Sequence, residues 1–272
     1  DAVSFVIPPG KVVSPKFPAT MNHYFPTSHL VYNCVLAALA RFNPARAVAP
    51  SGLGSGALAV GYARARSGKP MVQYELIINS LGGTSRHDGA SIVMSMNHYT
   101  PSTPVEIVET EYPILVRRFD IWPDSAGAGR QRGGMGVVRE YEFLDDCVLT
   151  LRASNRRFGA WGVLGGKGPK NSRTVINPEG PEREELGPIE TRQLKAGAVV
   201  RLEQSGGAGY GNPFERSVEQ VLEDLQNGYV TPEAAAAEYG VVVDSRTGAL
   251  DPDATGALRS RARSSEKAEG KA

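Results

Sequence analysis

The residue types best suited to chemistry in this chain lie in the turn-rich segment 122–136, between two strand-like runs. This segment contains five glycines, two arginines and one acid. Glycine lets backbone N–H groups approach a ligand or adopt positive φ, and arginine adds a fixed positive charge. The segment therefore suits an anion or a polarised carbonyl, but on its chemistry alone a tight corner in a β-rich fold is favoured, because glycine turns are far commoner than ligand loops. Its candidate anion-binding residues are Asp124, Arg130, Arg132, Gly133 and Gly134.

Two roles for the acid of this segment stay open at the level of sequence. In a binding loop, Asp124 would orient Arg130 or Arg132 toward a phosphate or a carboxylate. In a structural corner, Asp124 and the two arginines would brace each other across the turn.

The same segment belongs to an ordered series of motifs. Residues 104–113, 124–136 and 137–140 follow one another in a way that resembles the hydantoinase B/oxoprolinase family, although the spacing over 99–104 differs slightly from the family's pattern. The resemblance spans nearly the whole chain, and further matching stretches are 10–19, 206–213, 215–216, 227–231 and 235–241.

The resemblance implies ATP-dependent chemistry. Members of this family act on cyclic amides such as hydantoins or 5-oxoproline, or carboxylate a ketone, with ATP and Mg²⁺ bound on a partner subunit of hydantoinase A type. The resemblance covers only the C-terminal part of a typical member. The N-terminal part, whose acids and histidines could hold a divalent metal, has no counterpart here, so we expect a fragment, a processed half or a split subunit.

Three hypotheses follow for function. The first is a portion of a hydantoinase B-type subunit that needs the N-terminal part of that subunit and a hydantoinase A-type partner, and that lacks ATPase and amidase activity alone. The second is a non-catalytic assembly module of the same complex. The third is a domain that binds a small acid without catalysis.

A second candidate site is the stretch Arg86–Gly89, which resembles a short motif of the family. Here His87 and Asp88 are the candidate catalytic residues, because a histidine beside an aspartate can form a general base with a tuned pKa. The alternative is a polar turn in which Asp88 caps and Gly89 supplies positive φ.

The pattern of histidines does not predict a metal site in this chain. No pair has a recognised ligand spacing such as His-x-x-x-His, so surface or hydrogen-bonding roles are favoured over a site shared with Asp88. The four histidines are His23, His29, His87 and His98.

The glycine-rich loop 206–211 follows a strand-like run and precedes a helical one, as a phosphate loop would. It lacks the pattern and the lysine of a P-loop, so a tight strand-to-helix connection explains it better. No nucleophile elbow, HExxH or CxxC pattern is present either.

Charge and composition narrow the class of protein. Thirty basic and 29 acidic side chains give a net charge of +1, which argues against a general nucleic-acid surface. No apolar run is long enough for a bilayer span. Cys34, on a helix stripe, and Cys147, beside a strand, are expected to be buried free thiols, which fits a reducing, cytoplasmic compartment.

The periodicity predicts an α+β fold with a β-rich mixed-sheet core, long loops and a small helical C-terminal segment. A helix is expected from the N-cap Ser28 to Phe42. Residues 137–144 and 148–153 are expected to form a hairpin across Asp145 and Asp146. The other expected strands are 71–79, 104–111, 114–122, 174–176 and 198–203.

The C-terminal helices have clear boundary signals. Ser217 with Gln220 forms a capping box, with Gly228 as the stop, and Thr231 and Gly240 bound a second helix. A weaker helix is expected over 252–262. The expected organisation is a β-rich core over 1–212, a helical segment over 213–262 and a disordered tail over 263–272.

Overall fold

Two antiparallel sheets form the body of the protein. The computed structural model describes residues 4, 6–19, 25–52, 56–63, 68–77, 79–93, 102–154, 156–244 and 246–269. The first sheet has the strand order β2-β1-β5-β8 and the second the order β3-β4-β9-β6-β7. The strands are β1 (Gly56–Tyr62), β2 (Met71–Ile77), β3 (Ile114–Trp122), β4 (Gly136–Phe143), β5 (Cys147–Arg152), β6 (Arg173–Ile176), β7 (Glu184–Glu185), β8 (Ile189–Leu194) and β9 (Val199–Glu203).

The main hydrophobic core fills the space between these sheets. Alternate residues of each strand point inward, so Leu58 and Leu149 of the first sheet belong to one cluster with Tyr141, Val200 and Leu202 of the second. Fully burying a side chain of this size stabilises the fold by roughly 1.5–3 kcal/mol. The α+β class expected from the sequence is confirmed, and the described strand pairs are all antiparallel where a mixed sheet was expected.

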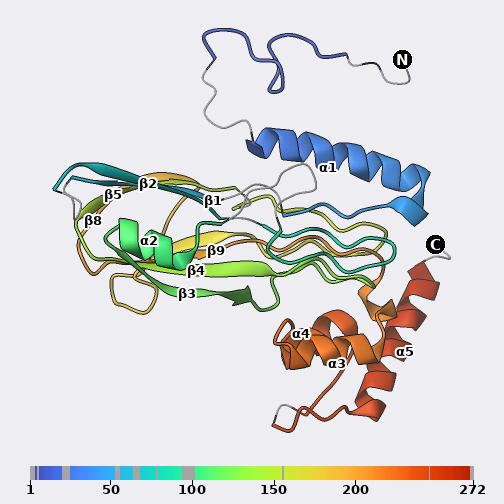
Figure 1. The fold of residues 1–272 in the computed structure, drawn as a ribbon. Coiled ribbons are helices and arrows are strands. Elements are labelled where there is room, and N and C mark those ends of the chain that lie inside the picture. Colours follow the sequence, from blue (N-terminus) through green and yellow to red (C-terminus); the bar gives the residue numbers. More distant parts are fainter. Residues whose placement is uncertain are drawn as a thin grey trace.

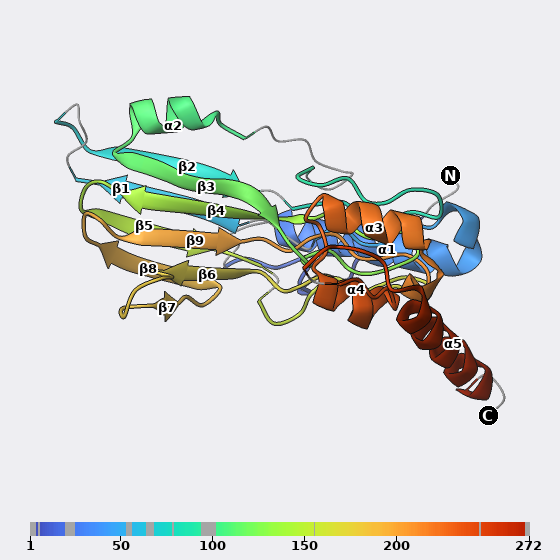
Figure 2. The same cartoon turned by 90° about the horizontal axis from the view of Figure 1, so that it is seen from below.

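Beyond the sheets, four extended segments run side by side (Figures 1 and 2). We call residues 79–90, 125–136, 160–170 and 204–211 the glycine layer. Their backbones bond directly to one another: Gly134 N donates to Leu81 O at 2.8 Å, and Gly209 N donates to Lys167 O at 2.9 Å. A Cβ on Gly133 would lie 1.8 Å from Gly207 O, so this approach is open only to glycine.

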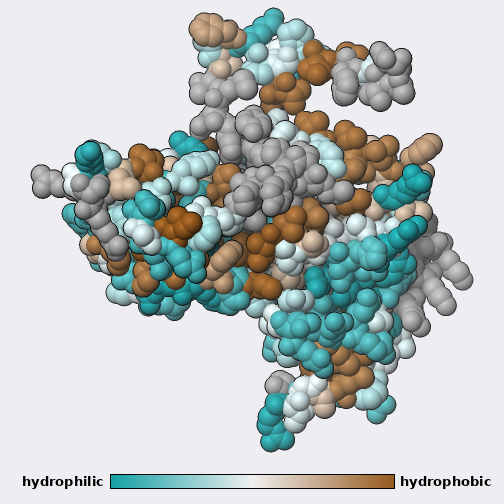
Figure 3. Space-filling view, viewed as in Figure 1, coloured by the Kyte–Doolittle hydropathy of each residue, from teal (hydrophilic) through white to brown (hydrophobic). Residues whose placement is uncertain are grey.

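Helices cover the glycine layer on both sides (Figure 1). On one side α1 (Phe25–Phe42) and the short 3₁₀ helix η1 (Pro44–Arg46) bring Ala40 and Ala47 against Ala208 and Tyr210. On the other side α3 (Val218–Gln226) and α4 (Pro232–Tyr239) bury Val221 around Ala128. The remaining helices are α2 (Val105–Glu111), the 3₁₀ helix η2 (Pro213–Glu215) and α5 (Pro252–Glu269). Hydrophobic residues gather over α1 in the space-filling view (Figure 3).

Four expectations from the sequence are corrected. Residues 105–111 form α2 and no strand, because Pro104 starts a helix whose Val108 enters the core. Strands β4 and β5 lie in different sheets, so residues 144–146 cross between sheets instead of closing a hairpin. Helix α1 begins at Phe25, which places Ser28 inside the helix, and Cys34 is exposed on it.

The C-terminal helices begin and end where the sequence predicts. The Ser217 and Thr231 side chains accept hydrogen bonds from the backbone N–H groups of Gln220 and Ala234, and Gly240 ends α4 in the left-handed region. Helix α5 continues to Glu269, beyond the expected end at 262 and into the stretch expected to be disordered. Within the described residues, no helix has the length and apolar character needed to cross a bilayer.

Candidate functional site

The turn that carries His87 is held by a threonine. Thr84 Oγ1 accepts hydrogen bonds from the backbone N–H groups of Arg86 and His87, at 3.2 and 2.9 Å. Gly89 does not have positive φ. It is needed because a Cβ there would lie 2.0 Å from Leu81 O. In this turn Thr84 accepts hydrogen bonds from the backbone N–H groups that Asp88 was expected to cap, and Gly89 lacks the expected positive φ. Both expectations are therefore corrected.

The carboxylate of Asp88 is bound by Arg216 and by the backbone of Arg132. Arg216 Nη1 and Nη2 donate to the two oxygens of the Asp88 carboxylate at 2.7 and 2.8 Å. The backbone N–H of Arg132 donates to the same carboxylate at 2.8 Å. Asp88 thus joins the glycine layer to the start of the C-terminal helical segment.

A second carboxylate completes this cluster. Asp224 of α3 accepts from Arg132 Nε at 2.9 Å and from Arg216 Nε at 3.0 Å. We call Asp88, Arg132, Arg216 and Asp224 the brace. It contains two positive and two negative side chains, so it is neutral overall, and Arg216 is only 2% exposed.

Burial and hydrogen bonding act in opposite directions on the pKa of Arg216. Burial lowers it, but the hydrogen bond to Asp88 and the charges of Asp224 and Asp88 outweigh burial and raise it. The arginine therefore stays charged within the protein, and that charge is balanced by the two carboxylates.

The brace changes the roles expected for several residues. Arg132 is buried, is paired with Asp224 and lies over the Tyr229 ring at 4.7 Å, so its guanidinium is not presented to solvent. Gly133 N and Gly134 N donate to Gly127 O and Leu81 O at 3.0 and 2.8 Å. Both amides are engaged within the glycine layer, which differs from the expected anion cradle.

Asp124 has a third role, outside both alternatives predicted for it. Its φ is 57°, and its carboxylate accepts from the backbone N–H and hydroxyl of Thr231 at 2.8 and 3.0 Å. A carboxylate at the first turn of α4 also complements the helix dipole. Asp124 therefore fixes the start of this helix, and neither orients nor braces the arginines.

The exposed side of this region is basic. Arg130 is exposed, lies over the Tyr210 ring at 5.8 Å, and makes a long hydrogen bond of 3.4 Å from Nη2 to Ser85 O. Arg86 and His87 are exposed on the adjoining turn. We call Arg86, His87 and Arg130 the basic surface.

The brace supports the basic surface from behind. Asp88 follows His87 directly in the chain, and Arg216 Nη1 donates to Arg130 O at 3.3 Å. The sequence analysis matched residues 215–216 to the family but gave Arg216 no role, and it did not single out Asp224. These two residues lie 128 and 92 residues from their partners Asp88 and Arg132. No local pattern signals such pairs.

The histidines are not gathered in the described part of the chain. His29 is buried on α1 and His87 is exposed, while His23 and His98 lie outside the described residues. Among the residues that the structure describes, no three His, Cys, Asp or Glu side chains are grouped closely enough to hold a metal ion.

The hydantoinase B/oxoprolinase family matches residues 1–213. The chain belongs to this family.

Two relatives of this hydantoinase B/oxoprolinase chain are named as enzyme subunits. It is 31% identical over 260 residues to a putative D-/L-hydantoinase B-type subunit of Pseudomonas sp. (strain NS671), covering 94% of this chain and 43% of that protein. It is 36% identical over 165 residues to the beta subunit of the caprolactamase of Pseudomonas jessenii, covering 58% of this chain and 28% of that protein. The names of both relatives imply a complex of several subunits.

Solved structures have the same fold. The ATP-dependent caprolactamase from Pseudomonas jessenii superposes with a TM-score of 0.83 at 26% identity, covering 94% of this chain and 46% of that chain. A nucleotide-free acetone carboxylase superposes with a TM-score of 0.74 at 20% identity, covering 86% and 37%, which shows the fold alone. The chain thus spans less than half the length of these matched proteins.

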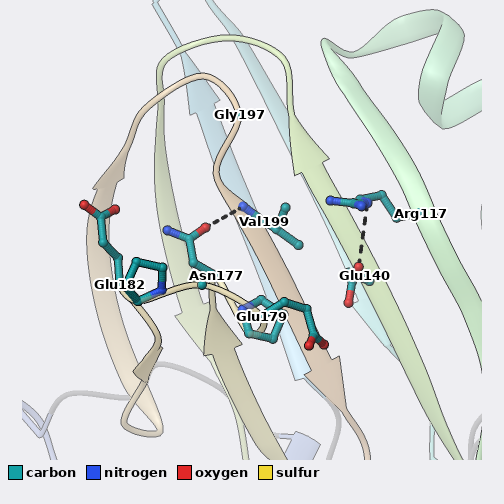
Figure 4. A pocket seen from close by; sticks show the side chains of 10 residues that line it. Arg117, Glu140, Asn177, Glu179, Glu182, Gly197 and Val199 are labelled. Atoms are coloured by element: carbon teal, nitrogen blue, oxygen red, sulfur yellow. Dashed lines mark hydrogen bonds and ion pairs between the residues drawn. The ribbon is translucent and has the colours of Figure 1, made fainter.

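A cleft of this family member lies away from the brace and the basic surface. It encloses about 530 Å³ on the five-stranded sheet, beneath the loop 177–182 (Figure 4). Its buried carboxylate, Glu140, is paired with Arg201 at 2.6 Å and with Arg117 at 3.8 Å. The loop adds Glu179 and Glu182, so this cleft is poorly suited to an anionic substrate.

Proposed function

We propose that this chain is a portion of a hydantoinase B-type subunit of an ATP-dependent enzyme. The enzyme hydrolyses cyclic amides such as hydantoin or 5-oxoproline, or carboxylates a ketone, and acts with a hydantoinase A-type partner. The observation that carries the proposal is the match to a B-type hydantoinase subunit over 94% of this chain, joined to the same coverage of the caprolactamase structure.

The basic surface is the part of this chain proposed to meet substrate. A guanidinium on a fixed backbone pairs with a carboxylate or a developing oxyanion, and Arg130 is the exposed arginine of the predicted loop. His87 lies on the adjoining turn and is the proposed proton carrier, because an imidazole can both donate and accept a proton. Asp88 and Arg132 hold these groups in place through the brace.

The nucleotide is better suited to the hydantoinase A-type partner than to this chain. A phosphate loop needs free backbone N–H groups, but the amides of Gly127, Gly207 and Gly209 already donate to carbonyls at 2.8 to 2.9 Å. ATP with Mg²⁺ is therefore assigned to that partner, where it would supply phosphoryl transfer. A divalent metal is assigned to the remaining part of the B-type subunit.

A second candidate function is a non-catalytic assembly module of the same complex. The closed and neutral brace favours it, because such a cluster fixes the geometry of the C-terminal helices without offering an unpaired charge. Under this alternative the basic surface would meet the acids of a neighbouring subunit.

Alanine at Arg130 separates the two functions. The assembled complex is purified with Arg130→Ala, His87→Ala or the control Arg183→Ala, which changes an exposed arginine outside the basic surface. The catalytic proposal expects the first two variants to assemble normally but to lose turnover by about tenfold or more, since the loss of a charged hydrogen bond costs roughly 1.5–3 kcal/mol. Loss of assembly with Arg130→Ala would support the assembly module instead.

A further inference from the structure

Helix α1 is apolar on the side that faces away from the molecule. His29, Asn33 and Ala40 are buried on one side of the helix, and Ala40 packs with Ala208 and Tyr210 of the glycine layer. Residues two positions further along are rotated by about 200° around the axis, so they face the opposite way. That outward side carries the exposed residues Val31, Val35, Leu39 and Phe42.

An apolar stripe along one side of a helix is typical of a surface that packs against other protein. Here Val35 is 53% exposed and Leu39 is 56% exposed, and hydrophobic residues are visible along α1 in Figure 3. Water would have to cover this stripe if the described chain were the whole unit. The stripe is therefore suited to a second layer of protein.

The outer face of the first sheet also carries exposed apolar residues. Val72 and Tyr74 of β2 point outward, while the alternating residues Gln73 and Glu75 are buried. Val72 lies in one row with Gly61 and Val148, and Tyr74 lies in one row with Ala59 and Thr150. These two rows carry small or apolar side chains and no charge across β2, β1 and β5.

The two apolar features lie on one side of the molecule. Helix α1 lies on the side toward which the first sheet presents its outer face (Figure 1). The segment 6–19 lies on that side too, and its Phe17 is 99% exposed. We call the outward stripe of α1 together with the outer face of β2, β1 and β5 the apolar face.

We propose that the apolar face binds the part of the hydantoinase B-type subunit that this chain does not contain. This inference rests on the proposed function, since it takes its occupant from that assignment. Relatives carry more than half of their length outside the matched region, because the chain covers 43% of the Pseudomonas sp. hydantoinase subunit and 46% of the caprolactamase chain. A segment of the same subunit makes a permanent contact, and permanent interfaces are hydrophobic like the core of a domain.

Charge also distinguishes this occupant from the partner of the basic surface. The apolar face has uncharged central rows, whereas Arg86, His87 and Arg130 suit an anionic group. Two chemically different surfaces on one chain fit two different neighbours. The apolar face binds the rest of its own subunit, and the basic surface binds the substrate or the acidic residues of a partner.

The probe is the complementary portion of the B-type subunit encoded in the same genome, tagged and co-expressed with this chain as a separate polypeptide. The two should purify together in equal amounts. The paired change Val35→Glu and Leu39→Glu should weaken the complex at least about tenfold, because two apolar contacts are replaced by buried charges. Tyr74→Lys should weaken it too.

A matched control uses another exposed apolar residue of a helix. Ile107 on α2 is 52% exposed, and Ile107→Glu should leave the complex unchanged. Labelling of the exposed Cys34 with a maleimide gives a second readout, because the complementary portion should slow it. Circular dichroism of each variant alone verifies that the fold is retained.

The inference is overturned if the complementary portion fails to bind, if the α1 and β2 variants bind as well as the unmodified chain, or if Ile107→Glu weakens binding equally. It is also overturned if the apolar face mediates a homodimer that excludes the complementary portion. The assay measures association alone, so a complex that assembles through this face but has no turnover would contradict only the proposed function.

Discussion

Arg216 donates hydrogen bonds from both of its terminal nitrogens to the carboxylate of Asp88, at 2.7 and 2.8 Å. The two residues lie 128 positions apart in the sequence. This fork-to-fork pair ties the turn that carries His87 to the chain just before α3. The two parallel hydrogen bonds fix the orientation of both partners, since the planar guanidinium matches the two oxygens of the carboxylate. The pair is therefore the link between the C-terminal helices and the basic surface.

Removing the charge of Asp88 should weaken the fold. Asp88→Asn leaves Arg216, which is buried, facing an amide that accepts only one of its two hydrogen bonds. We expect a loss of about 2 kcal/mol in the free energy of unfolding, measured by urea denaturation. Asp146→Asn is the control, because that carboxylate is exposed and pairs with the exposed Lys195, so its loss should have no measurable effect. An unchanged midpoint for Asp88→Asn would contradict the role of the brace.

Asp224 should matter more than Asp88. It is more deeply buried and is shared by Arg132 and Arg216. Asp224→Asn leaves two buried guanidinium groups with one carboxylate, and breaking a buried ion pair on one side costs roughly 3–5 kcal/mol. The same urea experiment should rank Asp224→Asn below Asp88→Asn in stability, and the reverse order would show that the carboxylates are not shared as described.

Close backbone contact in the glycine layer should make Gly133 intolerant of a side chain. A methyl group there would lie 1.8 Å from Gly207 O, which is a backbone atom. Neither the segment of Gly133 nor that of Gly207 can move away without breaking its backbone hydrogen bonds. Gly133→Ala should lower stability by roughly 3 kcal/mol, seen as a lower thermal midpoint. Gly256→Ala on the exposed side of α5 is the matched control and should be neutral or stabilising. Equal midpoints for the two variants would rule out the packed layer.

The sequence was informative where structure depends on neighbours in the chain. The caps at Ser217, Thr231 and Gly240 were predictable because a cap is a contact within three or four residues. The helix over 105–111 was missed because its Val108 is drawn into the core by tertiary packing, which overrides an alternating pattern.

In the candidate site, too, features that depend on neighbours in the chain were predictable, and contacts between distant residues were not. His87, Asp88 and Arg130 could be proposed from the sequence because they stand in recognisable motifs, and their functional roles stay predictions. Arg216 and Asp224 were not found, since they lie far in sequence from the residues they bind. The glycines were compatible with a ligand loop or a tight corner, and periodicity alone does not distinguish these two uses. In the structure the amides of Gly133 and Gly134 bond within the glycine layer.

Alkaline pH should destabilise the protein through a buried thiol. Burial, with the charges of Asp146 and Asp145, raises the pKa of Cys147 from its ordinary value of 9.0 to about 12. The folded state keeps this proton while the unfolded state loses it, so unfolding releases a proton above pH 9. Stability should therefore be constant with respect to this group below pH 9 and fall between pH 9 and 12.

The measurement is the urea midpoint as a function of pH, compared between the unmodified chain and Cys147→Ser. Burial also raises the pKa of Tyr62 and Tyr141, so part of the alkaline loss should remain in the variant. The decline that begins near pH 9 should be reduced in Cys147→Ser. A midpoint that rises with pH over this range would have the wrong sign and would exclude the assignment.

The central claim is that this chain contributes to an ATP-dependent enzyme that other chains complete. The most direct measurement is ADP release with hydantoin, 5-oxoproline, caprolactam, or acetone plus bicarbonate. It is made on the chain alone and on the chain reconstituted with the complementary portion of the B-type subunit and the hydantoinase A-type partner. We expect no turnover by the chain alone and substrate-dependent ADP release by the full set. Turnover by the chain alone, or an equal rate when the chain is omitted from the set, would contradict the account.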